Sequence, residues 1–195
     1  MSLFVARGVG SIEAAEAYGR ATELCEKHGG HRDLFAALWG LWLSRFASGG
    51  KGDVTVALNL SDKLLVLAQR PQEAGLRLQA HHSAWTTHFF CGAPETTLGH
   101  CQAGYRLYDM DRHRSHALLY GGHDPGVCAR AIAAHGEWLL GYPAKALASI
   151  DDAVVLAERL AHPFSLELAL MWATMIHQIR REPEQALRQA RRAEA

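Results

Sequence analysis

The chain has 195 residues, of which 49% are hydrophobic and 21% charged, and its 20 Lys and Arg residues balance 20 Asp and Glu residues. This length suits one domain, and a net charge of zero gives no general attraction to nucleic acid or to an anionic membrane, so we expect neither as a partner. The four cysteines have no CxxC spacing, and the sequence has neither a signal peptide nor 18 consecutive uncharged apolar residues. These features indicate a reducing, cytoplasmic location.

Segments rich in Ala, Leu, Glu and Arg alternate with short breaks marked by Gly or Pro, while strand-like runs of Val, Ile and Thr are rare. This pattern predicts an all-α fold. Because the breaks are short, consecutive helices are expected to pack as antiparallel neighbours. In chain order, we expect helices near residues 11–28, 32–47, 53–69, 72–90, 94–110, 125–140, 143–160, 164–180 and 183–193.

An internal repeat emerges when the breaks are aligned. Pro94, Pro143 and Pro183 each follow a break and suit the first turn of a helix, where a missing N–H removes no hydrogen bond. Val54 takes the place of the proline in an earlier copy, so the spacings are 40, 49 and 40 residues. A leucine stands four residues after each proline, and small residues stand ten before and ten after it. These residues are Leu98, Leu147 and Leu187, and Ala84, Gly104, Ala133, Ala153, Ala173 and Ala193.

The repeat predicts an α-solenoid of antiparallel helix pairs. Small residues are expected where the two helices of a pair cross, and leucines are expected to pack beneath that crossing. Stacked pairs cover an apolar face that one pair alone leaves exposed. The alternative is a bundle of four unrelated amphipathic pairs. We expect residues 1–195 to form a single domain with a partial first copy at Ser11. Because the sequence ends within a helical pattern, we also expect a fragment of a longer protein.

Two connections depart from the repeat. The third unit has nine extra residues around HRSHALLYGGHDPGV, which we expect to form a short turn against the solenoid or to carry function. Asp124 and Pro125 then read as the N-cap and first residue of the next helix. Residues 49–52 read GGKG, which lacks the GxxxxGK[ST] spacing of a phosphate loop, so we expect a flexible connection.

The alternation of small residues and leucines resembles tetratricopeptide repeats (TPR), although the period exceeds their usual length of about 34 residues. His88, Glu137 and His177 stand where the resemblance leads one to expect an aromatic residue. Several strings are also similar to the C-terminal repeat region of bacterial proteins that join a class III adenylate/guanylate cyclase domain to an AAA-type ATPase domain. The strings are LFAALWGLWL (34–43), LLVLAQR (64–70), LYGGHDPGV (119–127), WLLGYPAKAL (138–147) and AHPFSLELAL (161–170).

The resemblance runs from about Glu13 to Arg181 and implies a regulatory module of a signalling protein. Neither the cyclase nor the ATPase domain lies in the chain, so neither activity carries over. Related repeats also follow the ATPase of LuxR-type activators, which leaves a small-molecule sensor as the alternative function.

No residue pattern points to catalysis. The twelve histidines include His81, His82 and His88 on one predicted helix and a group around the insert, but they form no HExxH motif. The chain also has no GxSxG motif around a nucleophile. We therefore expect no cofactor, no metal and no enzyme activity. An independent metal-dependent enzyme is the remaining alternative, and it requires at least three convergent ligands.

In TPR-like solenoids the first helix of each pair lines the concave side. This resemblance predicts a groove for a protein or peptide, including a flanking cyclase or ATPase domain, and the exposed ends of the repeat also make a homodimer plausible. The alternative is that these side chains form core or pack against the insert. The expected binding residues are Trp39, Phe46, His82, Thr86, Phe89, His135, Trp138, Met171, Met175 and Gln178.

Overall fold

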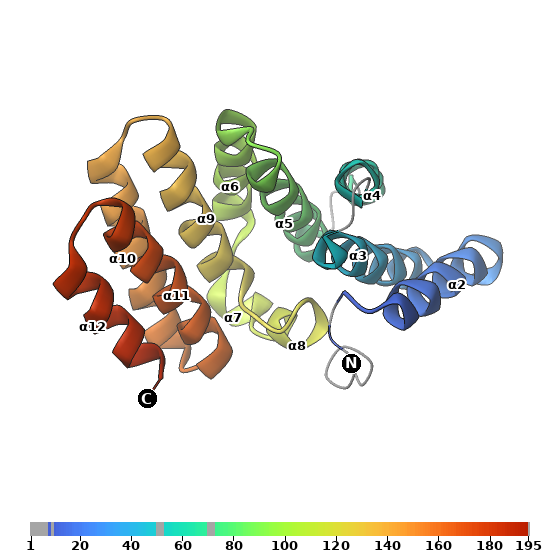
Figure 1. Cartoon of the computed structure of the whole chain (residues 1–195). Helices are drawn as coiled ribbons and strands as arrows, with labels where there is room; N and C mark the ends of the chain where they lie inside the picture. Colours follow the sequence, from blue (N-terminus) through green and yellow to red (C-terminus); the bar gives the residue numbers. More distant parts are fainter. Residues whose placement is uncertain (1–7, 9, 50–52, 70–72, 195) are drawn as a thin grey trace.

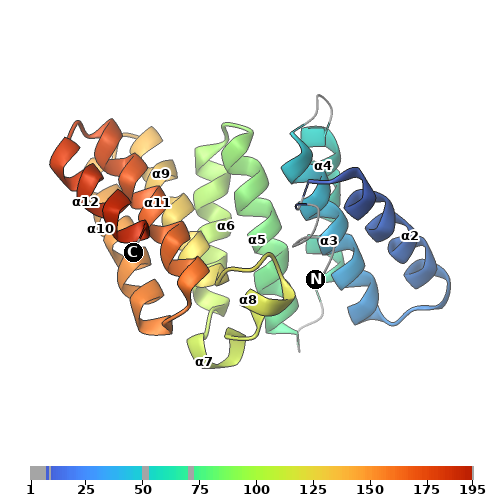
Figure 2. The same cartoon turned by 60° about the horizontal axis from the view of Figure 1, so that its bottom comes forward.

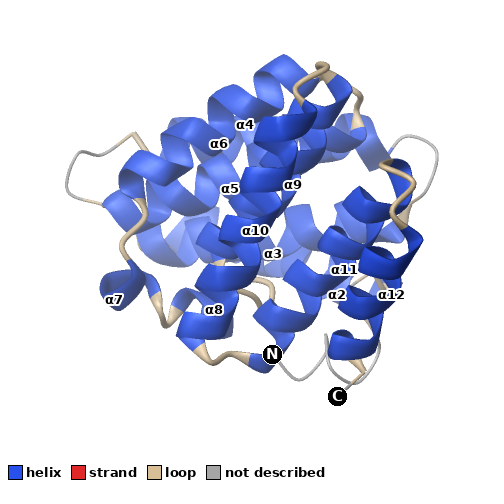
Figure 3. Cartoon of the chain, turned by 90° about the vertical axis from the view of Figure 1, so that its left-hand side faces the viewer, coloured by secondary structure: helices blue, strands red, loops and turns tan. Residues whose placement is uncertain are grey.

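The computed structural model describes residues 8, 10–49, 53–69 and 73–194, and every regular element in these ranges is a helix (Figure 3). The prediction of an all-α fold is therefore confirmed for the described residues. Residues 50–52, within the connection expected to be flexible, lie outside them. The helices are α2 (Ile12–His28), α3 (His31–Ser48), α4 (Asp53–Leu67), α5 (Ala74–Phe90), α6 (Pro94–Leu107), α7 (Met110–His113), α8 (His116–Leu119), α9 (Pro125–Leu139), α10 (Pro143–Leu160), α11 (Pro163–Ile179) and α12 (Pro183–Ala193).

The long helices pack in adjacent pairs, as expected from the short breaks between them (Figure 1). The pairs are α3 with α4, α5 with α6, α9 with α10 and α11 with α12, and α2 packs on α3. The second helix of each pair also contacts the first helix of the next pair, and α3, α5, α9 and α11 contact one another in turn.

The three proline-marked breaks fold alike. Gly92, Gly141 and Arg181 all adopt left-handed backbone, with φ of 73°, 83° and 61°. In each turn the N–H of this residue donates to the carbonyl three residues earlier, and the next N–H donates to the carbonyl five residues before it. A proline then begins the following helix, as predicted. The same local geometry thus recurs at equivalent positions of the repeat.

The small residues predicted at the helix crossings are buried at positions 84, 104, 133, 153 and 173 and partly buried at Ala193. The leucine prediction needs one correction. Leu98 lies against Gly136 of the next first helix and Leu147 packs on the core, but Leu187 is 51% exposed. Among the described residues, no further helix follows α12 to cover that face.

The buried apolar side chains form two clusters. The C-terminal core joins α5, α6, α9, α10 and α11 around residues such as Ile132, Ile150 and Leu170. The N-terminal core joins α3 and α4 around residues such as Trp42 and Leu64. Helix α5 contributes to both, because Leu78 and Trp85 belong to the first cluster and Ala80 to the second.

The insert is more ordered than a short turn, since it forms the one-turn helices α7 and α8 (Figure 2). Tyr120, which directly follows α8, is buried in the N-terminal core, with its ring centre 5.2 Å from that of Trp39 and 6.3 Å from that of Phe35. Asp124 then caps α9, as predicted, by accepting the N–H groups of Gly126 and Val127. The insert therefore links α6 to α9 while packing on α3.

Candidate functional site

The ten expected binding residues divide into three groups by exposure. Trp39, His82, Thr86 and His135 are buried; Phe46, Phe89 and Trp138 are partly buried; and Met171, Met175 and Gln178 are exposed. The first group lies in the interior, in agreement with the alternative in which an aromatic stripe at helical spacing is core. Only the third group, on α11, presents an open surface.

Aromatic rings connect the first helices of successive pairs. Trp42 stacks on Phe46 of the same helix at 5.7 Å, and Phe46 meets Phe90 of α5 edge-on at 5.2 Å. Phe90 contacts Trp172 of α11 at 6.5 Å, and Trp172 contacts His135 of α9 at 4.6 Å. These contacts form an aromatic band that joins α3, α5, α9 and α11.

An apolar groove of about 630 Å³ lies between α11 and α12. Met171 and Met175 line it and remain 45% and 41% exposed, and Glu167 and Glu194 stand among the lining residues. We call this surface the methionine groove. Its apolar lining comes from Phe164, Leu168, Met171, Met175, Ala190 and Ala193.

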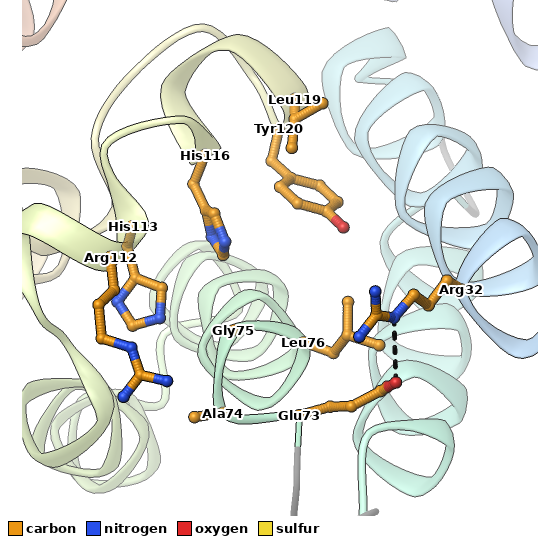
Figure 4. Close-up of a pocket in the computed structure, with 10 residues that line it drawn as sticks. All are labelled: Arg32, Glu73, Ala74, Gly75, Leu76, Arg112, His113, His116, Leu119 and Tyr120. Atoms are coloured by element: carbon orange, nitrogen blue, oxygen red, sulfur yellow. Dashed lines mark hydrogen bonds and ion pairs between the residues drawn. The ribbon is translucent and has the colours of Figure 1, made fainter.

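A second hollow of about 320 Å³ lies between α3, the start of α5 and the insert. Figure 4 shows this insert pocket, with His113 and His116 on one side and the Arg32–Glu73 ion pair on the other. The Arg32 Nε donates to Glu73 Oε1 at 3.1 Å. Burial, followed by the neighbouring His113, lowers the pKa of His116 to about 4. The pocket is therefore polar but gains no positive charge from His116 at neutral pH.

A chain of polar side chains leads from the insert pocket into the protein. Gln79 Nε2 lies 2.9 Å from His116 Nδ1, and Gln79 Oε1 lies 3.0 Å from Nδ1 of His82. The Nε2 atom of His82 lies 3.2 Å from Nε2 of His123. His82 stacks on Trp85 at 5.0 Å and is buried, and burial holds its pKa well below the usual range. The interior end of this series of polar side chains is thus a pair of neutral imidazoles.

Cys128 completes a group of three metal-binding residue types. Ligand atoms of His82, His123 and Cys128 all lie within 4.8 Å of one another, and across the described ranges this is the one group of at least three such residues that converges. No local sequence pattern reveals this group, because its three residues come from α5, the end of the insert and the first turn of α9. A partial signal is that His82 and Cys128 both lie on the first helices of consecutive pairs.

The fold and these surfaces define an all-helical protein of paired helices with an aromatic band across the first helices. Among the residues that the structure describes, no helix is long and apolar enough to cross a membrane. No protein-family model matches the chain, and a search of curated proteins also finds no match. Its function is therefore inferred from the methionine groove, the insert pocket and the histidine network.

Proposed function

We propose that the chain is a non-catalytic, TPR-like solenoid module that binds a helical segment of a protein partner in the methionine groove. Two features support the solenoid. The same left-handed turn recurs before Pro94, Pro143 and Pro183, and each first helix contacts the next one. A series of similar turns with neighbour-to-neighbour packing is typical of repeat proteins.

The exposed methionines are the observation that carries the binding proposal. Met171 and Met175 lie one helical turn apart on α11, and both remain open in a groove with other apolar residues. Methionine is flexible and polarizable, and it is common on surfaces that accept apolar helix faces. The acidic Glu167 and Glu194 complement basic residues. The expected occupant is therefore an amphipathic helix with an apolar stripe flanked by Lys or Arg.

The resemblance to cyclase- and ATPase-linked repeats suggests the setting of this interaction. In this proposal the module works in the cytoplasm, and the helix belongs to a signalling partner or to a flanking cyclase or ATPase domain. Coupling to such a domain requires that the partner bind two states of the module with different affinity. Neither nucleic acid nor a membrane surface is needed for this role.

Selection from a displayed library of helical peptides tests the proposal. The library varies the apolar stripe and the charge of its flanks, and selected peptides are then measured by fluorescence anisotropy. We expect enrichment of apolar residues at i, i+3, i+4 and i+7 with basic flanks. Replacing both methionines (Met171→Glu with Met175→Glu) should weaken binding by at least about tenfold, since the buried apolar contact is lost and two charges are introduced.

The matched control is Val155→Glu on α10, where the side chain is 53% exposed and lies outside the groove. This variant should bind the selected peptides as the unaltered chain does. The proposal is abandoned if no helical peptide is enriched, or if the methionine variant and the Val155 variant bind equally well.

A small-molecule sensor is the second candidate, because the insert pocket is polar, partly enclosed and connected to the interior through His116 and Gln79. A ligand there would contact the insert and α3 at once. Ligand-observed NMR with a library of small polar fragments tests this alternative. Binding that disappears in a His116→Leu variant would favour it, whereas no binding in the pocket would remove it.

A further inference from the structure

The contact between His82 and His123 poses a problem of hydrogen bonding. His123 Nδ1 lies 3.2 Å from the backbone oxygen of Gly121, which can only accept, so Nδ1 carries the proton. In the neutral ring Nε2 then presents a lone pair. His82 has the same arrangement, since its Nδ1 faces Gln79 Oε1 and its Nε2 faces His123 at 3.2 Å. With the Gln79 amide in this orientation, two lone pairs point at one another inside the protein, whereas the opposite amide orientation would place a proton between the two rings.

A bound cation relieves this repulsion. We propose that His82, His123 and Cys128 bind a single metal ion of the thiolate- and imidazole-binding class, Zn²⁺ or Cu⁺. In a tetrahedral zinc site with Zn–N bonds of about 2.0–2.1 Å, two nitrogen ligands are roughly 3.3 Å apart. The observed separation of the two Nε2 atoms is 3.2 Å. The nitrogen pair thus already has the spacing of two ligands on one ion.

The surroundings of the histidines fit this role. Ligating histidines usually donate the other ring N–H to an oxygen, which fixes the orientation of the ring. Here Gln79 Oε1 accepts from His82, and the Gly121 carbonyl accepts from His123. Trp39 also packs on His82, with ring centres 5.7 Å apart, and restricts its movement. Both imidazoles are therefore held with Nε2 directed at the shared position.

Cys128 supplies the third ligand. Its sulfur lies within 4.8 Å of a ring nitrogen of each histidine, compared with about 3.6 Å in a bound tetrahedral site, so a shift on the order of 1 Å brings it into place. Two buried donors, Trp85 Nε1 and Thr86 Oγ1, make no hydrogen bond to nitrogen or oxygen. Both donors interact with the Cys128 sulfur, which therefore lies in a position that N–H and O–H groups can reach. A metal ion would displace the thiol proton to solvent.

One of the three ligands lies closer to solvent than the other two. His82 and Cys128 are buried, but His123 is partly exposed and follows Gly121 and Gly122, which both have positive φ. Three protein ligands leave a fourth position for a small solvent-derived ligand on Zn²⁺, or a trigonal site for Cu⁺.

Metal titration of chelator-treated protein tests the proposal. The starting protein carries Cys25→Ser and Cys91→Ser, which remove the two thiols that are not buried. It is titrated with Zn²⁺, with Cu⁺ under reducing conditions, and with Co²⁺ as an optical probe. We expect one ion per chain and a thiolate-to-cobalt charge-transfer band. Cys128→Ser and His123→Gln should each weaken binding by at least about tenfold. Competition between chelators of known affinity shows which of Zn²⁺ and Cu⁺ is preferred.

The matched control is His100→Gln. His81 and His100 form a second histidine contact, with their Nδ1 atoms 2.9 Å apart, but among the described residues no third ligand atom converges on them. This variant should bind metal unchanged. The proposal is overturned by a lack of stoichiometric binding, by equal affinity in Cys128→Ser, or by NMR showing a proton shared between His82 and His123 in protein that takes up no metal. If Cys128→Ser does not fold by circular dichroism, the cobalt band of the starting protein still decides whether a thiolate is a ligand.

Discussion

Gly104 of α6 lies directly against the indole of Trp85 of α5. A Cβ at position 104 would come 2.5 Å from Cζ3 of Trp85, which is fully buried. The small residue ten positions after the proline thus allows the two helices of this pair to approach closely.

We predict that Gly104→Ala destabilises the protein by about 1–3 kcal/mol, because the added methyl overpacks a rigid aromatic contact. The gain in helix propensity, up to about 1 kcal/mol, offsets only part of this cost. Urea denaturation measures the change. Gly99→Ala on the same helix is the control, since a Cβ there meets no atom within 4 Å. It should stabilise by roughly 0.5–1 kcal/mol, and stabilisation by both substitutions would contradict the close crossing.

Arg181 occupies the left-handed position that is glycine in the two equivalent turns. We predict that Arg181→Gly raises the free energy of unfolding by about 0.5–1 kcal/mol, because the strain of a side chain at positive φ is removed. Thermal and urea denaturation provide the measurement. Gly141→Ala introduces the same strain at φ 83° and should lower stability by about 1 kcal/mol. If both substitutions raised the free energy of unfolding, or both lowered it, the result would be inconsistent with a shared turn geometry.

Asp124 is a buried cap with several partners. Its Oδ1 accepts the N–H groups of Gly126 and Val127 at 2.8 and 3.0 Å, and its Oδ2 accepts the Tyr108 hydroxyl at 3.1 Å. We predict that Asp124→Ala costs about 2–3 kcal/mol, since buried donors lose their acceptor. Differential scanning calorimetry can measure this loss. Asp109→Ala, at the exposed cap of the four-residue helix α7, should have a much smaller effect.

His116 makes stability depend on pH. Its folded-state pKa is about 4, below the unfolded value near 6.5, so the unfolded chain binds more protons at acidic pH. The contribution of neutral His116 is therefore complete above pH 6.5 and is lost as the pH falls toward 4, by on the order of 1–2 kcal/mol at pH 5. The charged groups around it are Arg112 of the insert, Arg32 of α3 and Glu73 before α5, with His113 beside it.

Urea denaturation between pH 8 and pH 5 tests this dependence. His116→Gln retains a hydrogen-bonding group for Gln79 but does not titrate, so the variant should lose less stability on acidification than the unaltered chain. His28→Gln is the control, because it removes an exposed histidine at the end of α2, far from the insert pocket in the sequence. If all three proteins lost the same free energy of unfolding between pH 8 and pH 5, His116 would be excluded as a source of acid sensitivity.

The local parts of the fold could be predicted because they depend on neighbouring residues. Pro94, Pro143 and Pro183 mark helix starts, and the glycines before the first two mark left-handed turns, so the helix pairs follow from spacing alone. Arg181 has no such signal, and its conformation is recognised only by its place in the repeat.

The site could be predicted only in part because it depends on contacts between distant residues. Met171 and Met175 are exposed as a groove requires, but Trp39 and His82 are covered by Tyr120 and His123 from the insert. The contacts of Trp39 with Tyr120 and of His82 with His123 join residues far apart in the sequence, so no spacing pattern predicts them. The convergence of His82, His123 and Cys128 is invisible for the same reason.

Helix α5 supplies side chains to both cores, with Ala80 on one side and Leu78 and Trp85 on the other. The boundary between the N-terminal core and the C-terminal core therefore lies within helix α5 and not in a loop. A fragment that ends at α4 would lack Ala80 and Tyr120, while one that begins at α5 would expose Ala80 to water. Dissection of this chain for biochemical work thus requires that α5 be kept in every piece.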